Sequence, residues 1–103
     1  MVRKFVDDRE WEKFHAPKNV SMALAIEAAE LMEHFQWLSI DESRNIHAEP
    51  GKQEAVGEEI ADIICYALAL ANTLGIDVSE TMSAKMKKNE AKYPVERFRG
   101  SFE

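Results

Sequence analysis

The sequence predicts an all-α protein, with residues 1–103 forming one domain of four helices that completes its helix bundle by oligomerisation. Strand signals are almost absent. Residues 20–35 and 60–72 are apolar on nearly every side of a helix, which is typical of buried helices. A domain this small buries too little surface to cover two such helices, so we expect further copies of the chain to cover them.

The first helix is predicted over roughly residues 3–15. Pro17 ends it, because the residue before a proline disfavours the helical conformation. The second helix is predicted from about residue 19 to residue 38, with Asn19 or Ser21 as its N-cap.

A polar linker over residues 39–51, with room for one helical turn, leads to the third helix, predicted over about residues 52–74. Gly75 suits the position just after its end, where the chain commonly adopts a left-handed conformation.

The fourth helix is predicted to begin at a cap formed by Asp77 or Ser79 and to run to about Lys92. Residues 95–103 are predicted to be a loosely ordered tail, so the structured core spans about residues 5–94.

The composition argues against several functional classes. A formal net charge of -6 argues against binding to a nucleic acid polymer or to an anionic membrane surface. No uncharged apolar run is long enough to span a membrane, and the first residues lack a signal-peptide pattern. The single cysteine, Cys65, excludes a disulfide within the chain and is predicted to be a small buried residue. We therefore expect a cytoplasmic protein.

Two pairs of carboxylates, each three residues apart, lie inside the apolar helices. Glu27 and Glu30 form the first pair, and Glu59 and Asp62 form the second, with Glu58 directly before it. Residues three apart share one face of a helix, so each pair aims at one point. Carboxylates in apolar surroundings need a partner, and two facing pairs therefore predict an oxygen cage for Mg²⁺ or Mn²⁺.

Other interpretations of these acids remain open. They can be exposed acids on amphipathic helices, or acids paired with lysines across an oligomer interface. They can also form a structural metal site in a non-catalytic, oligomeric helical module. Glu58 is a ligand, a general base or an exposed residue. A carboxylate-bridged di-iron centre would need two Glu-x-x-His pairs, and the chain has only Glu12 with His15.

Aromatic and basic residues flank the predicted cage. Trp11 and Trp37 suit packing in a core or stacking on a nucleobase. Lys85 and Asn89 are four residues apart and share a helix face. Lysines at such a position are typical of a solvated helix end, and beside a metal they can hold phosphate groups.

These patterns together resemble one protein family. The spacing of the acidic pairs and the Lys-x-x-x-Asn-x-x-x-Tyr-Pro pattern of residues 85–94 are similar to the MazG-like all-α nucleoside triphosphate pyrophosphohydrolases. Residues 9–19 and the Phe-Gln-Trp sequence of residues 35–37 are similar to the dCTP pyrophosphatase branch in particular. The similarity covers roughly residues 5–94.

The resemblance implies a chain that forms dimers, which commonly pair into tetramers. It also implies Mg²⁺-dependent cleavage of a nucleoside triphosphate, dCTP or a modified dCTP, between its α- and β-phosphates. The products would be a nucleoside monophosphate and pyrophosphate, and the implied cellular role is house-cleaning of the nucleotide pool.

Position by position, the resemblance implies a role for each candidate residue. The metal ligands would be Glu27, Glu30, Glu59 and Asp62, and either Glu30 or Glu58 would orient the attacking water. The substrate would be bound by Trp11, His15, Trp37, Tyr66, Lys85, Asn89 and Tyr93. Val2 stands where eukaryotic members have a polar residue near the base, so the base preference is left open.

Overall fold

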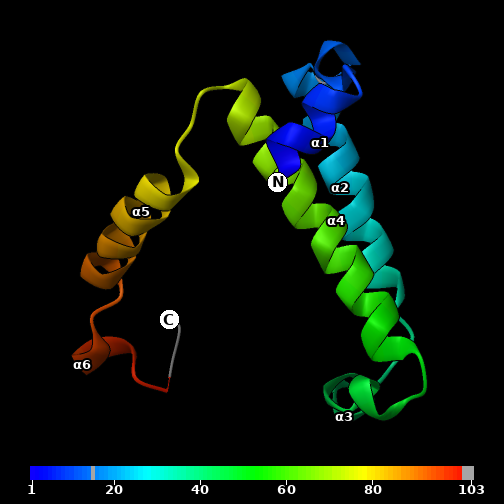
Figure 1. The fold of residues 1–103 in the computed structure, drawn as a ribbon. Helices are drawn as coiled ribbons and strands as arrows, with labels where there is room; N and C mark the ends of the chain where they lie inside the picture. Colours follow the sequence, from blue (N-terminus) through cyan, green and yellow to red (C-terminus); the bar gives the residue numbers. More distant parts are fainter. Residues whose placement is uncertain (15, 101–103) are drawn as a thin grey trace.

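The computed structural model describes residues 1–14 and 16–100, which form helices and contain no strand. The all-α prediction is confirmed for this part of the chain. Its two longest helices, α2 (Pro17–Glu33) and α4 (Lys52–Thr73), lie side by side and run in opposite directions (Figure 1). They carry the two predicted acidic pairs.

The N-terminal segment forms two short helices, α1 (Val2–Asp8) and the 3-10 helix η1 (Trp11–Phe14), so the single helix predicted over residues 3–15 is wrong. Glu10 interrupts it with a φ of 52°, in the left-handed region that residues with a side chain rarely adopt. A hydrogen bond of 3.3 Å from the Arg3 guanidinium to the Asn72 side-chain oxygen ties α1 to α4.

Helix α2 begins with Pro17 at its first position, where the missing N–H of proline costs no hydrogen bond. Ala16 therefore takes the N-cap position, and the predicted caps Asn19 and Ser21 lie inside the helix. The Ser21 hydroxyl donates a hydrogen bond to a backbone carbonyl of the preceding turn. The helix ends at Glu33, before the predicted residue 38, and residues 34–37 form turns.

The linker contains α3 (Ile40–Arg44) and the 3-10 helix η2 (Ile46–Ala48), which confirms the predicted helical turn. A capping box begins α3: the Ser39 hydroxyl accepts from the Glu42 N–H at 3.1 Å, and the Glu42 carboxylate accepts from the Ser39 N–H at 2.9 Å. Ile46 is buried where η2 contacts α4.

Gly75 ends α4 with a φ of 67°, as predicted. Asp77, one of the two predicted caps, begins α5 (Val78–Lys92) by accepting a hydrogen bond of 3.0 Å from the Glu80 N–H. The next helix, α6 (Val95–Phe98), occupies the first part of the tail that was predicted to be loosely ordered.

Helix α5 makes an angle of 104° with α4 and stands apart from the α2–α4 pair (Figure 1). The radius of gyration is accordingly 17.3 Å, whereas a compact domain of this length has about 13 Å. The accessible surface is 8508 Å², against about 5,900 Å² for a compact monomer of this mass. Among the described residues, no single helix is long and apolar enough to cross a membrane, and only the bent pair α4–α5 together reaches that length and composition.

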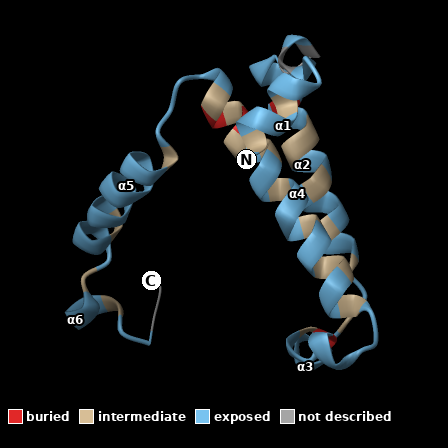
Figure 2. Cartoon of the chain, viewed as in Figure 1, coloured by how far each residue is buried: buried red, intermediate tan, exposed pale blue. Residues whose placement is uncertain are grey.

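Few described residues are buried within one chain, and the buried ones lie near the two ends of the α2–α4 pair (Figure 2). The prediction that both apolar helices are buried is therefore not met by one chain. Ile26 on α2 is 59% exposed and Ile64 on α4 is 52% exposed. Their apolar surface needs another partner.

Candidate metal centre

Helices α2 and α4 bring three of the four predicted metal ligands together. One carboxylate oxygen each from Glu27, Glu30 and Glu59 lie within 4.8 Å of one another. Glu27 and Glu30 are three residues apart on α2, and Glu59 faces them from α4. Glu27 and Glu59 are half-buried, whereas Glu30 is exposed.

The fourth predicted ligand, Asp62, lies near this cluster without completing it. Its negative charge contributes to raising the pKa of both Glu27 and Glu30. It also lines the same cavity as Glu27. Glu58, the predicted ligand or base, is exposed on α4 and lies outside the three-residue cluster.

The electrostatics of the cluster favour retention of a proton. Contact with the Glu59 carboxylate, then loss of hydration and the charges of Glu59 and Asp62, raise the pKa of Glu27 above its ordinary value. Contact with the Glu27 carboxylate and its charge raise the pKa of Glu30. The ion pairs Lys4–Asp8 and Arg44–Asp41 do not involve these acids.

The cluster fits a hard divalent cation. The Oε2 atom of Glu59 is buried and has no hydrogen-bond partner among the described residues. A buried polar atom without a partner is costly, because it has lost its hydration and gained nothing in return. Several carboxylate oxygens around one point are the donors that Mg²⁺ and Mn²⁺ prefer, and a cation there would supply the missing partner.

A cavity of about 410 Å³ opens beside the cluster. Its acidic wall comes from Glu27 on α2 and Asp62 on α4, and Tyr66 lies one turn further along α4. Its apolar and aromatic wall comes from α1 and η1, including Phe5 and Trp11. Four predicted site residues on three helices therefore line one cavity.

The cavity also contains residues that the sequence patterns did not assign to a site. Val2, Phe5 and Val6 line it, and their spacing of three and four residues is the signal that they share one helix face. Cys65 lines the cavity too and is exposed. Its predicted burial is wrong, because one chain leaves this face of α4 uncovered.

The two predicted tryptophans do not meet within one chain. Trp11 precedes α2, whereas Trp37 follows it and is 87% exposed. A helix of 17 residues is about 25 Å long at 1.5 Å per residue. A single chain therefore cannot place both indoles on one base.

The predicted phosphate ligands are also separated from the acidic cluster. Lys85 and Asn89 lie on α5, and Tyr93 follows that helix directly. Helix α5 stands apart from the α2–α4 pair that carries the acids (Figure 1). His15, predicted to bind substrate, lies outside the described residues.

Comparisons with known proteins agree on one family. The sequence pattern of the MazG-like family matches residues 22–101. The dCTP pyrophosphatase 1 proteins of Rattus norvegicus and Homo sapiens are 39% and 36% identical to this chain over 98 residues. That alignment covers 95% of this chain and 58% of each relative, so the chain spans less than two thirds of the length of these relatives. The crystal structure of a pyrophosphatase from Archaeoglobus fulgidus DSM 4304 is similar with a TM-score of 0.79 and 44% sequence identity, covering 90% of this chain and 85% of that one.

Proposed function

Because this chain belongs to the MazG-like family, we propose that it is a divalent-metal-dependent hydrolase that cleaves a nucleoside triphosphate to the monophosphate and pyrophosphate. The observation that carries the proposal is the cavity with an acidic wall beside an aromatic one. The acidic wall suits metal-bound phosphates, and the aromatic wall suits a base. The name of these relatives, dCTP pyrophosphatase 1, supports dCTP as the substrate. A modified dCTP as the substrate and house-cleaning of the nucleotide pool as the role are proposed from the family resemblance.

The proposed metal ligands are Glu27, Glu30, Glu59 and Asp62. Bound there, Mg²⁺ (or Mn²⁺) would neutralise phosphate charge and lower the pKa of a water that attacks phosphorus. Because the pKa values of Glu27 and Glu30 are raised, protons compete with a cation for these side chains more strongly than for ordinary carboxylates. The fit rests on the close carboxylate oxygens and on the unpartnered Oε2 of Glu59.

Either Glu30 or Glu58 is proposed to orient the attacking water, and the two carboxylates differ in position. Glu30 belongs to the oxygen cluster, whereas Glu58 lies outside it on the exposed side of α4. A residue that only accepts a proton from water does not need to bind the cation. If Glu58 is the base, Glu58→Gln loses turnover and retains stabilisation by Mg²⁺. If Glu30 is the base and a ligand, Glu30→Gln loses both.

The base of the nucleotide is proposed to lie against Trp11 and Tyr66, since aromatic rings stack on any base. Trp37 can join this pocket only from a second copy, because it lies at the far end of α2 in its own chain. In an antiparallel pairing of two α2–α4 pairs, the C-terminal end of one α2 meets the N-terminal end of the other. Such a dimer would bring Trp37 of one chain to Trp11 of the next.

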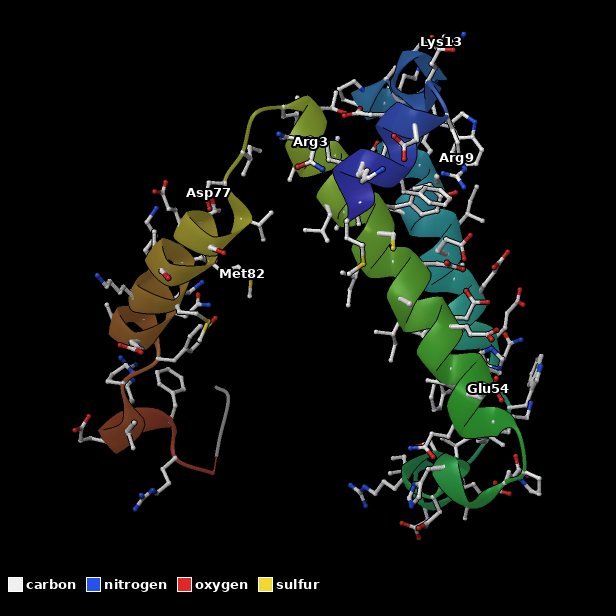
Figure 3. The ribbon with its side chains drawn as sticks, in the orientation of Figure 1. Arg3, Arg9, Lys13, Glu54, Asp77 and Met82 are labelled. Atoms are coloured by element: carbon white, nitrogen blue, oxygen red, sulfur yellow. The ribbon has the colours of Figure 1, made fainter. Side chains whose placement is uncertain are left out.

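The phosphates are proposed to be held by Lys85, Asn89 and Tyr93 of a second copy. Helix α5 carries an exposed apolar stripe, in which the exposed fraction is 61% for Met82 and 53% for Met86. Met82 lies well away from the α2–α4 pair (Figure 3). The stripe continues into Asn89 because these residues are three or four apart. An exposed stripe of this kind needs a partner surface.

Charge supports the same arrangement. The part of the chain from residue 85 onward carries six basic and three acidic side chains, whereas residues 1–84 carry seven basic and sixteen acidic ones. The basic C-terminal arm of one chain is therefore complementary to the acidic body of another. The surface in excess of a compact monomer supports a homo-oligomer, either a dimer or a tetramer.

A nucleotide panel with product analysis tests the proposal. The purified chain is incubated with dCTP, 5-substituted dCTP, dUTP and dTTP in Mg²⁺, and the products are separated by ion-exchange chromatography. The expected products are the monophosphate and pyrophosphate in equal amounts, and Glu59→Gln is expected to abolish both. Release of orthophosphate alone contradicts the proposal. Stabilisation by Mg²⁺ without any turnover supports the alternative, a non-catalytic helical module with a structural metal.

A further inference from the structure

Arg9 contacts both aromatic rings of the cavity wall. Its guanidinium carbon lies 3.8 Å from the centre of the Phe5 ring and 5.9 Å from the centre of the Trp11 ring. The two rings meet edge to face, with centres 5.5 Å apart and an interplanar angle of 77°. These distances lie within the range at which a cation is attracted to a ring face.

The backbone holds this arrangement from two sides. The Arg9 guanidinium donates a hydrogen bond of 3.1 Å to the Phe5 carbonyl, which fixes the side chain along α1. Glu10 then adopts its left-handed conformation, so the chain reverses between α1 and η1 and Trp11 returns to Phe5. A residue with a side chain at this position is strained, and such strain is concentrated at functional sites.

The same two rings line the cavity that Glu27 and Asp62 close on its acidic side. Phe5 is 48% and Trp11 is 42% exposed, so neither ring is fixed by burial in a core. Arg9 directly follows α1 and lies at the end of the α2–α4 pair (Figure 3). Its contacts therefore decide how the aromatic wall faces the cavity.

We propose that Arg9 is a positioning residue that holds Phe5 and Trp11 as one aromatic wall, and that Phe5 contacts the planar ring of the ligand together with Trp11. This inference rests on the proposed function, because the ligand ring is taken to be the base of the nucleotide. Arg9 acts through the two rings and does not touch the reacting phosphates. Loss of Arg9 then weakens ligand binding and leaves the chemical step unchanged.

The test replaces Arg9 by methionine and by lysine. Lys4→Met is the matched control, because Lys4 is a nearby cation on α1 and forms an ion pair of 2.8 Å with the exposed Asp8. For Arg9→Met we expect KM for the triphosphate to rise about two- to fivefold, the loss of one exposed cation–π contact, at unchanged kcat. Arg9→Lys keeps the cation and is expected to restore part of the affinity, and Lys4→Met is expected to change neither constant.

A spectroscopic measurement keeps the inference separate from the enzymatic activity. In a Trp37→Phe background Trp11 is the only tryptophan, and its quenching by acrylamide and by dCMP is measured without turnover. Arg9→Met is expected to increase acrylamide quenching and to weaken dCMP binding. Glu10→Val, which cannot keep the left-handed turn, is expected to do the same, whereas Glu10→Gly keeps it and behaves like the parent protein.

Failure of the Arg9 inference can be distinguished from failure of the proposed hydrolysis. Unchanged Trp11 quenching and unchanged KM in Arg9→Met overturn the inference, and so does a loss of kcat at constant KM, which would place Arg9 at the phosphates. If the parent protein binds dCMP and shows the expected Arg9 effect but cleaves no triphosphate, the proposed hydrolysis is wrong and the positioning role stands.

Discussion

Replacement of Ile64 by glutamate is expected to convert the assembled protein into single chains. Ile64 is 52% exposed on α4, one turn beyond Ile60, which is 44% exposed. The accessible surface of 8508 Å² exceeds that of a compact monomer by about 2,600 Å². An excess of this size per chain matches the interfaces of obligate homodimers, and Ile64 lies on the apolar face available to form one.

The expected loss of dimer stability follows from the exposed fraction of the Ile64 side chain. Full burial of an isoleucine is worth about 1.5–3 kcal/mol, so the half that remains exposed contributes roughly 1 kcal/mol in each copy. A glutamate in the same place adds a desolvation cost of several kcal/mol unless it finds a partner. A two-fold interface contains the substitution twice. The dimer is therefore destabilised by at least about 4 kcal/mol, which corresponds to roughly a thousandfold in Kd.

The assay is light scattering coupled to size-exclusion chromatography, over a range of protein concentrations. Gln53→Glu is the matched control, because it adds the same charge at an exposed position of the same helix without removing apolar surface. Wild type and the control are expected to elute as the oligomer, and Ile64→Glu as the monomer. A monomeric wild type, or an Ile64→Glu variant that keeps the wild-type mass, would refute the reasoning.

Three further predictions concern the site. Mg²⁺ at about one hundred times its Kd is expected to stabilise the protein by about 2.7 kcal/mol, which is measured as a rise in melting temperature. Glu27→Gln and Glu59→Gln should each abolish this rise. A rise retained in both variants would exclude the predicted carboxylate site for the cation. Glu27 and Glu30 have raised pKa values in the folded chain, so they add stability below their ordinary pKa that is lost as pH rises through the raised values. The melting temperature of metal-free wild type relative to Glu27→Gln should therefore fall as pH rises above about 4, and a difference that is flat or rises would contradict this. Trp37 is 87% exposed in one chain and is expected to become buried on assembly. In a Trp11→Phe variant the fluorescence of Trp37 should therefore be blue-shifted, and it should move to longer wavelength when Ile64→Glu is added. Equal emission with and without Ile64→Glu would place Trp37 outside the interface.

The sequence predicted the fold class and the acidic cluster because both depend on short-range patterns. The three-residue spacing of Glu27 and Glu30 puts them on one face of α2 in any helix of that register, and Glu59 faces them once α2 and α4 pair. The MazG-like family was predictable for the same reason and is confirmed. Helix ends were predicted where a single residue decides them, as Gly75 and Asp77 do.

The remaining features depend on properties that a local pattern does not contain. The left-handed Glu10 has no glycine or asparagine to signal it, so the break between α1 and η1 was not predicted. The exposure of Cys65 follows from how little one chain covers its own helices, and the length of α2 separates Trp37 from Trp11. The roles of the predicted substrate ligands therefore remain predictions about an assembly.

Mixing two inactive variants tests the two-chain site most directly. One variant carries Glu59→Gln and keeps α5 intact, and the other carries Lys85→Ala with Asn89→Ala and keeps the acidic cluster intact. If the arm of one chain completes the cluster of the other, coexpressed mixed dimers contain one intact site, and the mixture should recover about a quarter of wild-type pyrophosphate release. Activity no higher than the sum of the two variants alone would mean that each site is built from one chain, and would contradict the account.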